Sequence, residues 1–111
     1  MLTDTIVADA NVVIGAMVDR IAREFHPVRI MLFGSRARGT ARPDSHVDLL
    51  VVLPEVSDKR RVTVEILRRL NGFGLPKGVV VTTPEEIARR GHLVGTVLLP
   101  ALEEGRVLYE R

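Results

Sequence analysis

The sequence of 111 residues contains no cysteine and no tryptophan, and its aromatic residues are limited to three Phe and one Tyr. The absence of cysteine excludes disulfides and thiolate metal sites. So few aromatic side chains give little support to a surface on which nucleic-acid bases could stack. No apolar run approaches the ~20 residues of a membrane-spanning helix, and no signal-peptide pattern is visible. We therefore expect a cytoplasmic protein without membrane contact.

The charges are nearly balanced, with 16 Lys and Arg against 14 Asp and Glu and a formal net charge of +2. Such a balance does not by itself indicate a nucleic-acid-binding protein, so nucleic acid is not a favoured partner. The hydrophobic content of 46% is ordinary for a globular protein. A chain of this length can bury roughly two thirds of its unfolded surface. We expect one domain over residues 1–111.

The order of polar and apolar residues predicts alternating helices and strands. Apolar residues at helical spacing predict a long first helix from about Thr5 to Phe25. Further helices are expected over residues 36–39 and 57–70, from Thr83 onward, and over 94–104. Strands are expected over residues 28–33, 46–53 and 78–82, and residues 107–109 can add a short fourth strand. This order indicates the α/β (α+β) class, with a small sheet flanked by helices.

Two helix starts carry signals at single residues. Ser35 follows the first strand and is expected to cap the short helix after it. Thr83 is expected to cap a later helix, with Pro84 at its first position. Glu86 lies three residues after Thr83, so its side chain is expected to complete a capping box.

The strand over residues 46–53 is expected to lie in the centre of the sheet. After Asp48 its residues are apolar on both faces, which is typical of a strand covered on both sides. Asp48 is thus an acid near the start of an otherwise apolar strand, a place where a carboxylate often serves only as a turn acceptor.

The segment with the clearest chemistry joins the first two strands. Gly34 and Ser35 form a turn at the end of the first strand, Arg36 and Arg38 follow, and a ten-residue spacer leads from Ser35 to His46. A Gly-Ser turn before a helix offers backbone N–H groups and a hydroxyl to phosphates. Arginines add bidentate phosphate contacts, although the same arginines could simply form a solvated helix face.

This layout resembles the DNA polymerase β-type nucleotidyltransferases. Their motif is an apolar strand, Gly-(Gly/Ser), a spacer, and then Asp-apolar-(Asp/Glu)-apolar. Other segments resemble the minimal, single-domain members of this group. These segments are Leu75-Pro76, Val79-Val80-Val81, Thr83-Pro84-Glu85-Glu86 and Glu104-Gly105-Arg106-Val107-Leu108-Tyr109-Glu110. The similarity therefore covers nearly the whole chain. The chain is therefore identified as a member of the minimal nucleotidyltransferase family.

The resemblance carries expectations about fold, ligands and partners. It implies a polymerase-β-like fold with a small mixed sheet, a nucleoside triphosphate substrate, with ATP the first choice, and Mg²⁺ or Mn²⁺ as cofactor. Better-understood members act as antitoxins that bind, and can nucleotidylate, an all-helical HEPN-type partner. A homo-oligomer is also compatible, because the minimal domain lacks elements that larger relatives use to hold acceptors.

The resemblance assigns roles to individual residues, and two positions depart from the pattern. Gly34 and Ser35 match the phosphate-binding turn, with Arg36 and Arg38 as further phosphate contacts. Asp48 matches the second metal-binding acid and is the expected catalytic residue. His46 stands where the first acid should be, and Gly78 lies where the third is expected.

Loss of two acids makes a two-metal site doubtful. Mg²⁺ prefers oxygen ligands, and a single aspartate supplies too few of them to bind it well. Imidazole suits Mn²⁺ or Zn²⁺ better, so His46 and Asp48 form only a tentative metal site. Three hypotheses stay open: an active nucleotidyltransferase, an antitoxin-like pseudoenzyme that binds its partner without transfer, and a non-catalytic module that binds nucleotide or RNA phosphates.

Overall fold

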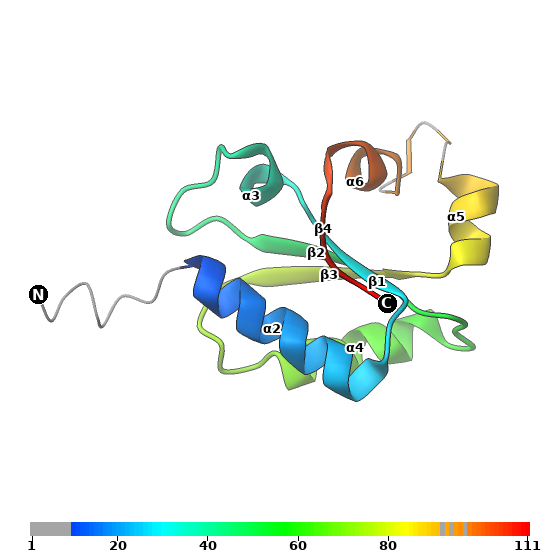
Figure 1. Ribbon diagram of the computed structural model, residues 1–111, viewed down its shortest axis with the longest axis horizontal. Helices are drawn as coiled ribbons and strands as arrows, with labels where there is room; N and C mark the ends of the chain where they lie inside the picture. Colours follow the sequence, from blue (N-terminus) through cyan, green and yellow to red (C-terminus); the bar gives the residue numbers. More distant parts are fainter. Residues whose placement is uncertain (1–9, 92, 94, 97) are drawn as a thin grey trace, which may run out of the picture.

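The computed structural model describes residues 10–91, 93, 95, 96 and 98–111, and it shows a four-stranded sheet between two layers of helices (Figure 1). The elements in chain order are α2 (Ala10–Phe25), β1 (Arg29–Phe33), α3 (Ser35–Arg38), β2 (Val47–Val52), α4 (Lys59–Arg69), β3 (Lys77–Thr82), α5 (Pro84–Arg90), α6 (Leu98–Glu104) and β4 (Arg106–Glu110). Among these, no helix is long and apolar enough to cross a membrane.

The sheet has the strand order β3-β2-β1-β4 and is mixed. β1 runs antiparallel to both β2 and β4. β2 runs parallel to β3, and α4 makes the crossover between them. The predicted small mixed sheet flanked by helices is confirmed, and the short fourth strand forms the edge beside β1.

β2 is an inner strand of the sheet, as predicted, and both of its faces are covered. Val47, Leu49 and Val51 belong to a buried cluster with side chains of α2 and α4, including Met17 and Ile66. The alternate side chains of β2 belong to a second cluster that includes residues of α6. Figure 1 shows the same division, with α2 and α4 on one face of the sheet and α3, α5 and α6 on the other. By this alternation Asp48 lies on the α6 face.

Several predicted boundaries need correction. The helix expected from Ser57 begins at Lys59, because Asp58 caps it by accepting a hydrogen bond from Arg61 N at 3.1 Å. In the described part of the chain, the first helix begins at Ala10 and the last at Leu98. The earlier predicted residues 5–9, together with 94 and 97, lie outside the described residues.

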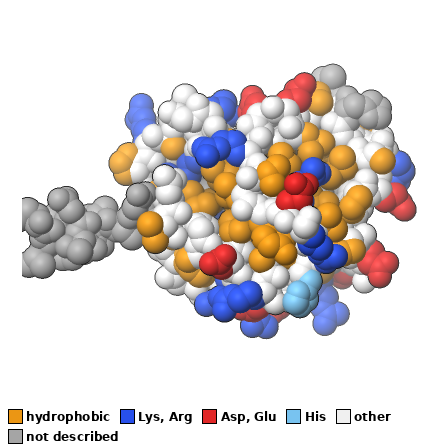
Figure 2. Space-filling view, viewed as in Figure 1, with side chains coloured by type: hydrophobic (Ala, Val, Ile, Leu, Met, Phe, Trp, Pro, Cys, Tyr) orange, Lys and Arg blue, Asp and Glu red, His pale blue; other side chains and the backbone are white. Residues whose placement is uncertain are grey.

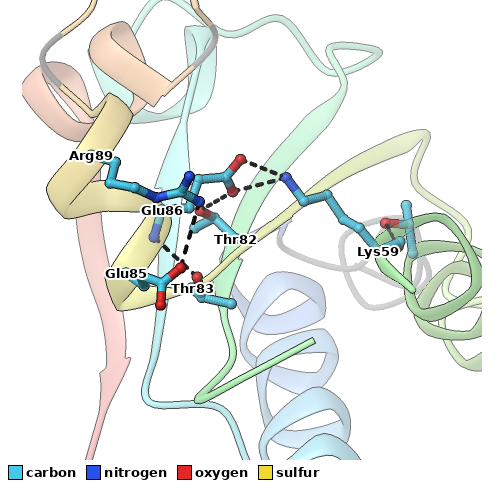
Figure 3. Close-up of polar contacts among 7 residues, drawn as sticks. Lys59, Thr82, Thr83, Glu85, Glu86 and Arg89 are labelled. Atoms are coloured by element: carbon cyan, nitrogen blue, oxygen red, sulfur yellow. Dashed lines mark hydrogen bonds and ion pairs between the residues drawn. The ribbon is translucent and has the colours of Figure 1, made fainter. Parts of the chain in front are cut away.

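The predicted capping box at the start of α5 is half right. Thr83 Oγ1 accepts a hydrogen bond from Glu86 N at 3.1 Å, so the Thr83 cap is confirmed. The Glu86 carboxylate does not reach back to Thr83, because it accepts hydrogen bonds from Lys59 Nζ at 2.7 and 2.8 Å and from Thr82 Oγ1 at 2.6 Å (Figure 3). Glu86 therefore ties the start of α4 to β3 and α5.

The hydrogen bonds of Glu86 predict that the free energy of unfolding depends on pH in the acidic range. The hydrogen bonds from Lys59 and Thr82 lower the pKa of Glu86. A lowered folded-state pKa contributes stability above the ordinary glutamate value, and the contribution is lost as the pH falls through the folded-state pKa. Glu86→Gln is therefore expected to cost about 1 kcal/mol at neutral pH and to flatten the loss of stability below about pH 5.

The measurement is urea unfolding between pH 3 and pH 7. Glu85→Gln on the same helix is the matched control, because Glu85 is exposed and pairs only loosely with Arg89, at 3.6 Å. If Glu86→Gln leaves the pH dependence of the unfolding free energy unchanged, the Glu86 carboxylate does not contribute to it and the prediction is wrong.

Candidate active site

The predicted site residues meet at one end of the sheet. Gly34 directly follows the last residue of β1, Phe33, which is the register partner of Asp48. Asp48 is in turn the register partner of Gly78 in β3. Neighbouring strands lie about 4.8 Å apart, so the Gly-Ser turn, Asp48 and Gly78 form a short row across three strands.

Gly34 is in contact with the Asp48 carboxylate. A Cβ atom on Gly34 would lie 2.3 Å from Asp48 Oδ2, closer than any side chain can be. Gly34 also has φ 76° and ψ −157°, a region that only glycine adopts readily. Two independent constraints therefore require glycine here, and the second of them comes from the acid in the next strand.

Ser35 begins α3 instead of capping it. Gly34 occupies the N-cap position and makes no side-chain capping bond, so the predicted capping role of Ser35 is wrong. The Ser35 carbonyl accepts hydrogen bonds from the backbone N–H groups of Gly39 and Thr40. α3 is therefore a single tight turn that returns the chain toward β2.

Asp48 is half-buried, and its charge is influenced from two sides. Burial raises the pKa of Asp48 above its ordinary value, because a carboxylate is less stable away from water. The positive charges of His46 and Arg38 oppose part of this rise. His46 and Arg38, which the motif predicted as site residues, thus lie close enough to Asp48 to affect its pKa.

The two arginines of the motif have different surroundings. Arg36 donates to the backbone carbonyls of Arg42, Pro43 and Ser45, at distances of 2.9 to 3.4 Å. Arg38 Nη1 forms an ion pair with Glu104 Oε1 of α6 at 3.1 Å, and both side chains are about half exposed. Sequence reasoning missed Glu104, since no local pattern links it to Arg38 across 66 positions.

Comparison with known proteins identifies the family. The model of the nucleotidyltransferase domain matches residues 16–101, most of the chain. The chain belongs to this nucleotidyltransferase family. Comparison with curated proteins gives no significant match.

Two solved structures show the same fold. One is a provisionally assigned nucleotidyltransferase from Sulfolobus solfataricus, with a TM-score of 0.63 and 20% identity over 89% of this chain and 78% of that one. The other is a toxin-antitoxin structure with AMP-PNP, with a TM-score of 0.53 and 17% identity over 87% of this chain and 73% of that one. The predicted polymerase-β-like nucleotidyltransferase fold is confirmed by the first of these similarities.

Members of this nucleotidyltransferase family generally use a nucleoside triphosphate and divalent metal ions, which makes the donor set of the site important. Within the part of the chain that the structure describes, no three His, Asp or Glu side chains come together as potential metal ligands. Asp48 and His46 are the two candidates at the site. One carboxylate and one exposed imidazole do not fit a two-metal centre.

Gly78, which is the expected position of the family's third acid, lies beside Asp48 in the sheet. A Cβ atom on Gly78 would lie 3.4 Å from Asp48 Oδ1, so a side chain at this position would lie against the carboxylate. A carboxylate at position 78, where the third acid of the family pattern is expected, would thus lie beside Asp48, and this chain has glycine there. Of the three acids that the family resemblance leads us to expect, this chain has Asp48, with His46 and Gly78 at the other two positions.

Proposed function

We propose that the chain is an antitoxin-like member of the nucleotidyltransferase family in which nucleotidyl transfer is weakened or lost. It keeps the fold and the phosphate-binding turn of Gly34 and Ser35, and Arg38, whose ion pair with Glu104 is exposed, lies near Asp48. The observation that carries the proposal is the donor set around Asp48, where His46 and Gly78 replace two acids. One carboxylate supplies too few protein ligands to hold two metal ions at a triphosphate.

The proposed partner is a small helical toxin of the HEPN type. The similarity to a toxin-antitoxin structure supports this choice at the level of the fold. Neutralising a partner by binding needs a complementary surface but no metal ion. A family member that lost its metal ligands could therefore keep this role.

The alternative is a module that binds nucleotide or RNA phosphates without a partner, and the site favours it less. Arg36 is engaged by backbone carbonyls, and the negative charge of ionised Asp48 opposes a phosphate placed at the turn. Figure 2 shows positive and negative side chains interspersed on the face in view, and no continuous basic patch there. A nucleic-acid interface would need such a patch.

A transfer assay tests the proposal. The protein, alone and with a helical partner, is incubated with labelled ATP and either Mg²⁺ or Mn²⁺. We expect no label on either protein, and partner binding that is unchanged in Asp48→Ala. Metal-dependent labelling that Asp48→Ala abolishes would instead establish an active enzyme.

A further inference from the structure

We propose that Arg36 is a positioning residue that holds His46 beside Asp48, and that it does not contact nucleotide phosphate. The family resemblance treats Arg36 and Arg38 alike, as cations next to a phosphate-binding turn. Their contacts in the structure divide the two roles. The inference rests on the proposed function only where nucleotide binding is used as a readout.

The loop that Arg36 contacts is already a closed turn. Ser45 N donates to the Arg42 carbonyl at 3.0 Å, and Arg42 N donates to Ser45 Oγ at 2.8 Å. Pro43 at the second position has a fixed φ, which suits such a turn. The loop thus presents several carbonyl groups in one fixed arrangement.

Arg36 occupies this arrangement with two of its nitrogen atoms. Nε and Nη2 donate to the Ser45 carbonyl at 3.2 and 2.9 Å, and Nη2 also lies 3.4 Å from the Arg42 carbonyl and 3.3 Å from that of Pro43. A planar guanidinium can serve several acceptors at once, whereas a lysine ammonium is a single point charge. These donors are directed at the loop and are not available to a ligand.

The contact matters to the site because it fixes the residue before β2. The Ser45 carbonyl is held by Arg36, and the Val47 N–H donates to the Pro76 carbonyl at 2.8 Å. His46 therefore lies between two anchored peptide groups, with its side chain on the same face as Asp48. Without Arg36 the first anchor is lost, and the ten-residue spacer no longer sets the position of His46.

Arg38 supplies the contrast. Its ion pair with Glu104 is exposed, and exposed pairs contribute little and exchange readily with water. Arg38 is also close enough to Asp48 to act on the pKa of that carboxyl. Of the two arginines, Arg38 is the one that can turn to a phosphate.

The test compares three charge-conserving variants, Arg36→Lys, Arg38→Lys and Arg42→Lys, by amide hydrogen exchange and by the NMR signals of the His46 ring. In Arg36→Lys we expect the amides of Arg42 and Ser45 to exchange about tenfold faster and the His46 signals to shift. Arg42→Lys is the matched control, because Arg42 uses its backbone in these contacts and its side chain makes no hydrogen bond or ion pair in the described residues, and it should change neither. Arg38→Lys should leave the loop amides unchanged.

The second measurement is the ATP affinity of the wild type and of Arg36→Lys in EDTA. A positioning role predicts that Arg36→Lys changes loop exchange, the His46 signals and ATP affinity together, the last by about threefold (~0.7 kcal/mol). A loss of ATP affinity with unchanged loop exchange would make Arg36 a phosphate ligand and overturn the inference. Faster loop exchange with unchanged His46 signals would overturn it too, because the role would be structural only. If the wild type does not bind ATP, the phosphate-binding part of the proposed function fails, and the exchange and ring signals still decide the role of Arg36.

Discussion

Gly34→Ala is expected to lower the free energy of unfolding by about 3 kcal/mol and the Tm by roughly 10 °C. The backbone of Gly34 has φ 76° and ψ −157°, which costs any other residue of the order of 1–3 kcal/mol. The added methyl group would also lie 2.3 Å from Asp48 Oδ2, so the carboxylate or the turn must move. Thermal unfolding followed by circular dichroism measures the effect.

A double-mutant cycle separates the two contributions. Asp48→Ala removes the carboxylate, so in the Gly34→Ala background it should restore about 1 kcal/mol relative to additivity. Gly39→Ala is the matched control, because Gly39 has φ 80° but nothing lies within 4 Å of its added Cβ atom. It should show backbone strain and no coupling to Asp48. Additive effects of Gly34→Ala and Asp48→Ala would mean that the turn and the acid are not in contact.

Restoring the acids is expected to create a metal site. In His46→Asp/Gly78→Asp, carboxylates at positions 46 and 78 would flank Asp48, and position 78 lies directly against Asp48 Oδ1. Three carboxylates repel one another in the absence of metal and supply the oxygen ligands that Mg²⁺ and Mn²⁺ need. We expect Mn²⁺ to bind the variant at least about 100-fold more tightly than the wild type, which corresponds to ~2.7 kcal/mol.

Calorimetry with Mn²⁺ measures the gain, and metal should raise the Tm of the variant but not of the wild type. His46→Asp/Lys77→Asp is the matched control. Lys77 pairs with Val47, so its side chain lies on the opposite face of the sheet from Asp48. If both double variants gain Mn²⁺ affinity equally, or neither gains any, the assignment of position 78 is wrong.

Sequence patterns were sufficient to predict the elements that depend on residues close together in the chain. Apolar residues on both faces after Asp48 predicted the central strand, and Thr83 and Pro84 predicted the start of α5. The helix starts at Ser35 and Ser57 were misplaced, because Gly34 and Asp58 compete for the capping position and the tertiary setting decides between them.

The site itself could be predicted only as a set of residues. The motif named Gly34 and Asp48, but the register that brings Asp48 between Phe33 and Gly78 depends on strand pairing over long sequence distances. The engagement of Arg36 by loop carbonyls could not be predicted either, because backbone acceptors leave no signature in a sequence. The prediction that His46 stands in place of the first acid comes from the family pattern and stays a prediction.

The most direct test of the reduced metal site is calorimetry of the wild-type protein with ATP, once in EDTA and once in Mn²⁺. Because Asp48 is the one carboxylate that the described residues place beside the Gly34 turn, we predict that Mn²⁺ changes the ATP affinity by less than about threefold, or ~0.7 kcal/mol. A gain of about 100-fold with Mn²⁺, lost in Asp48→Ala, would show that His46 and Asp48 still hold a working metal centre and would contradict the account.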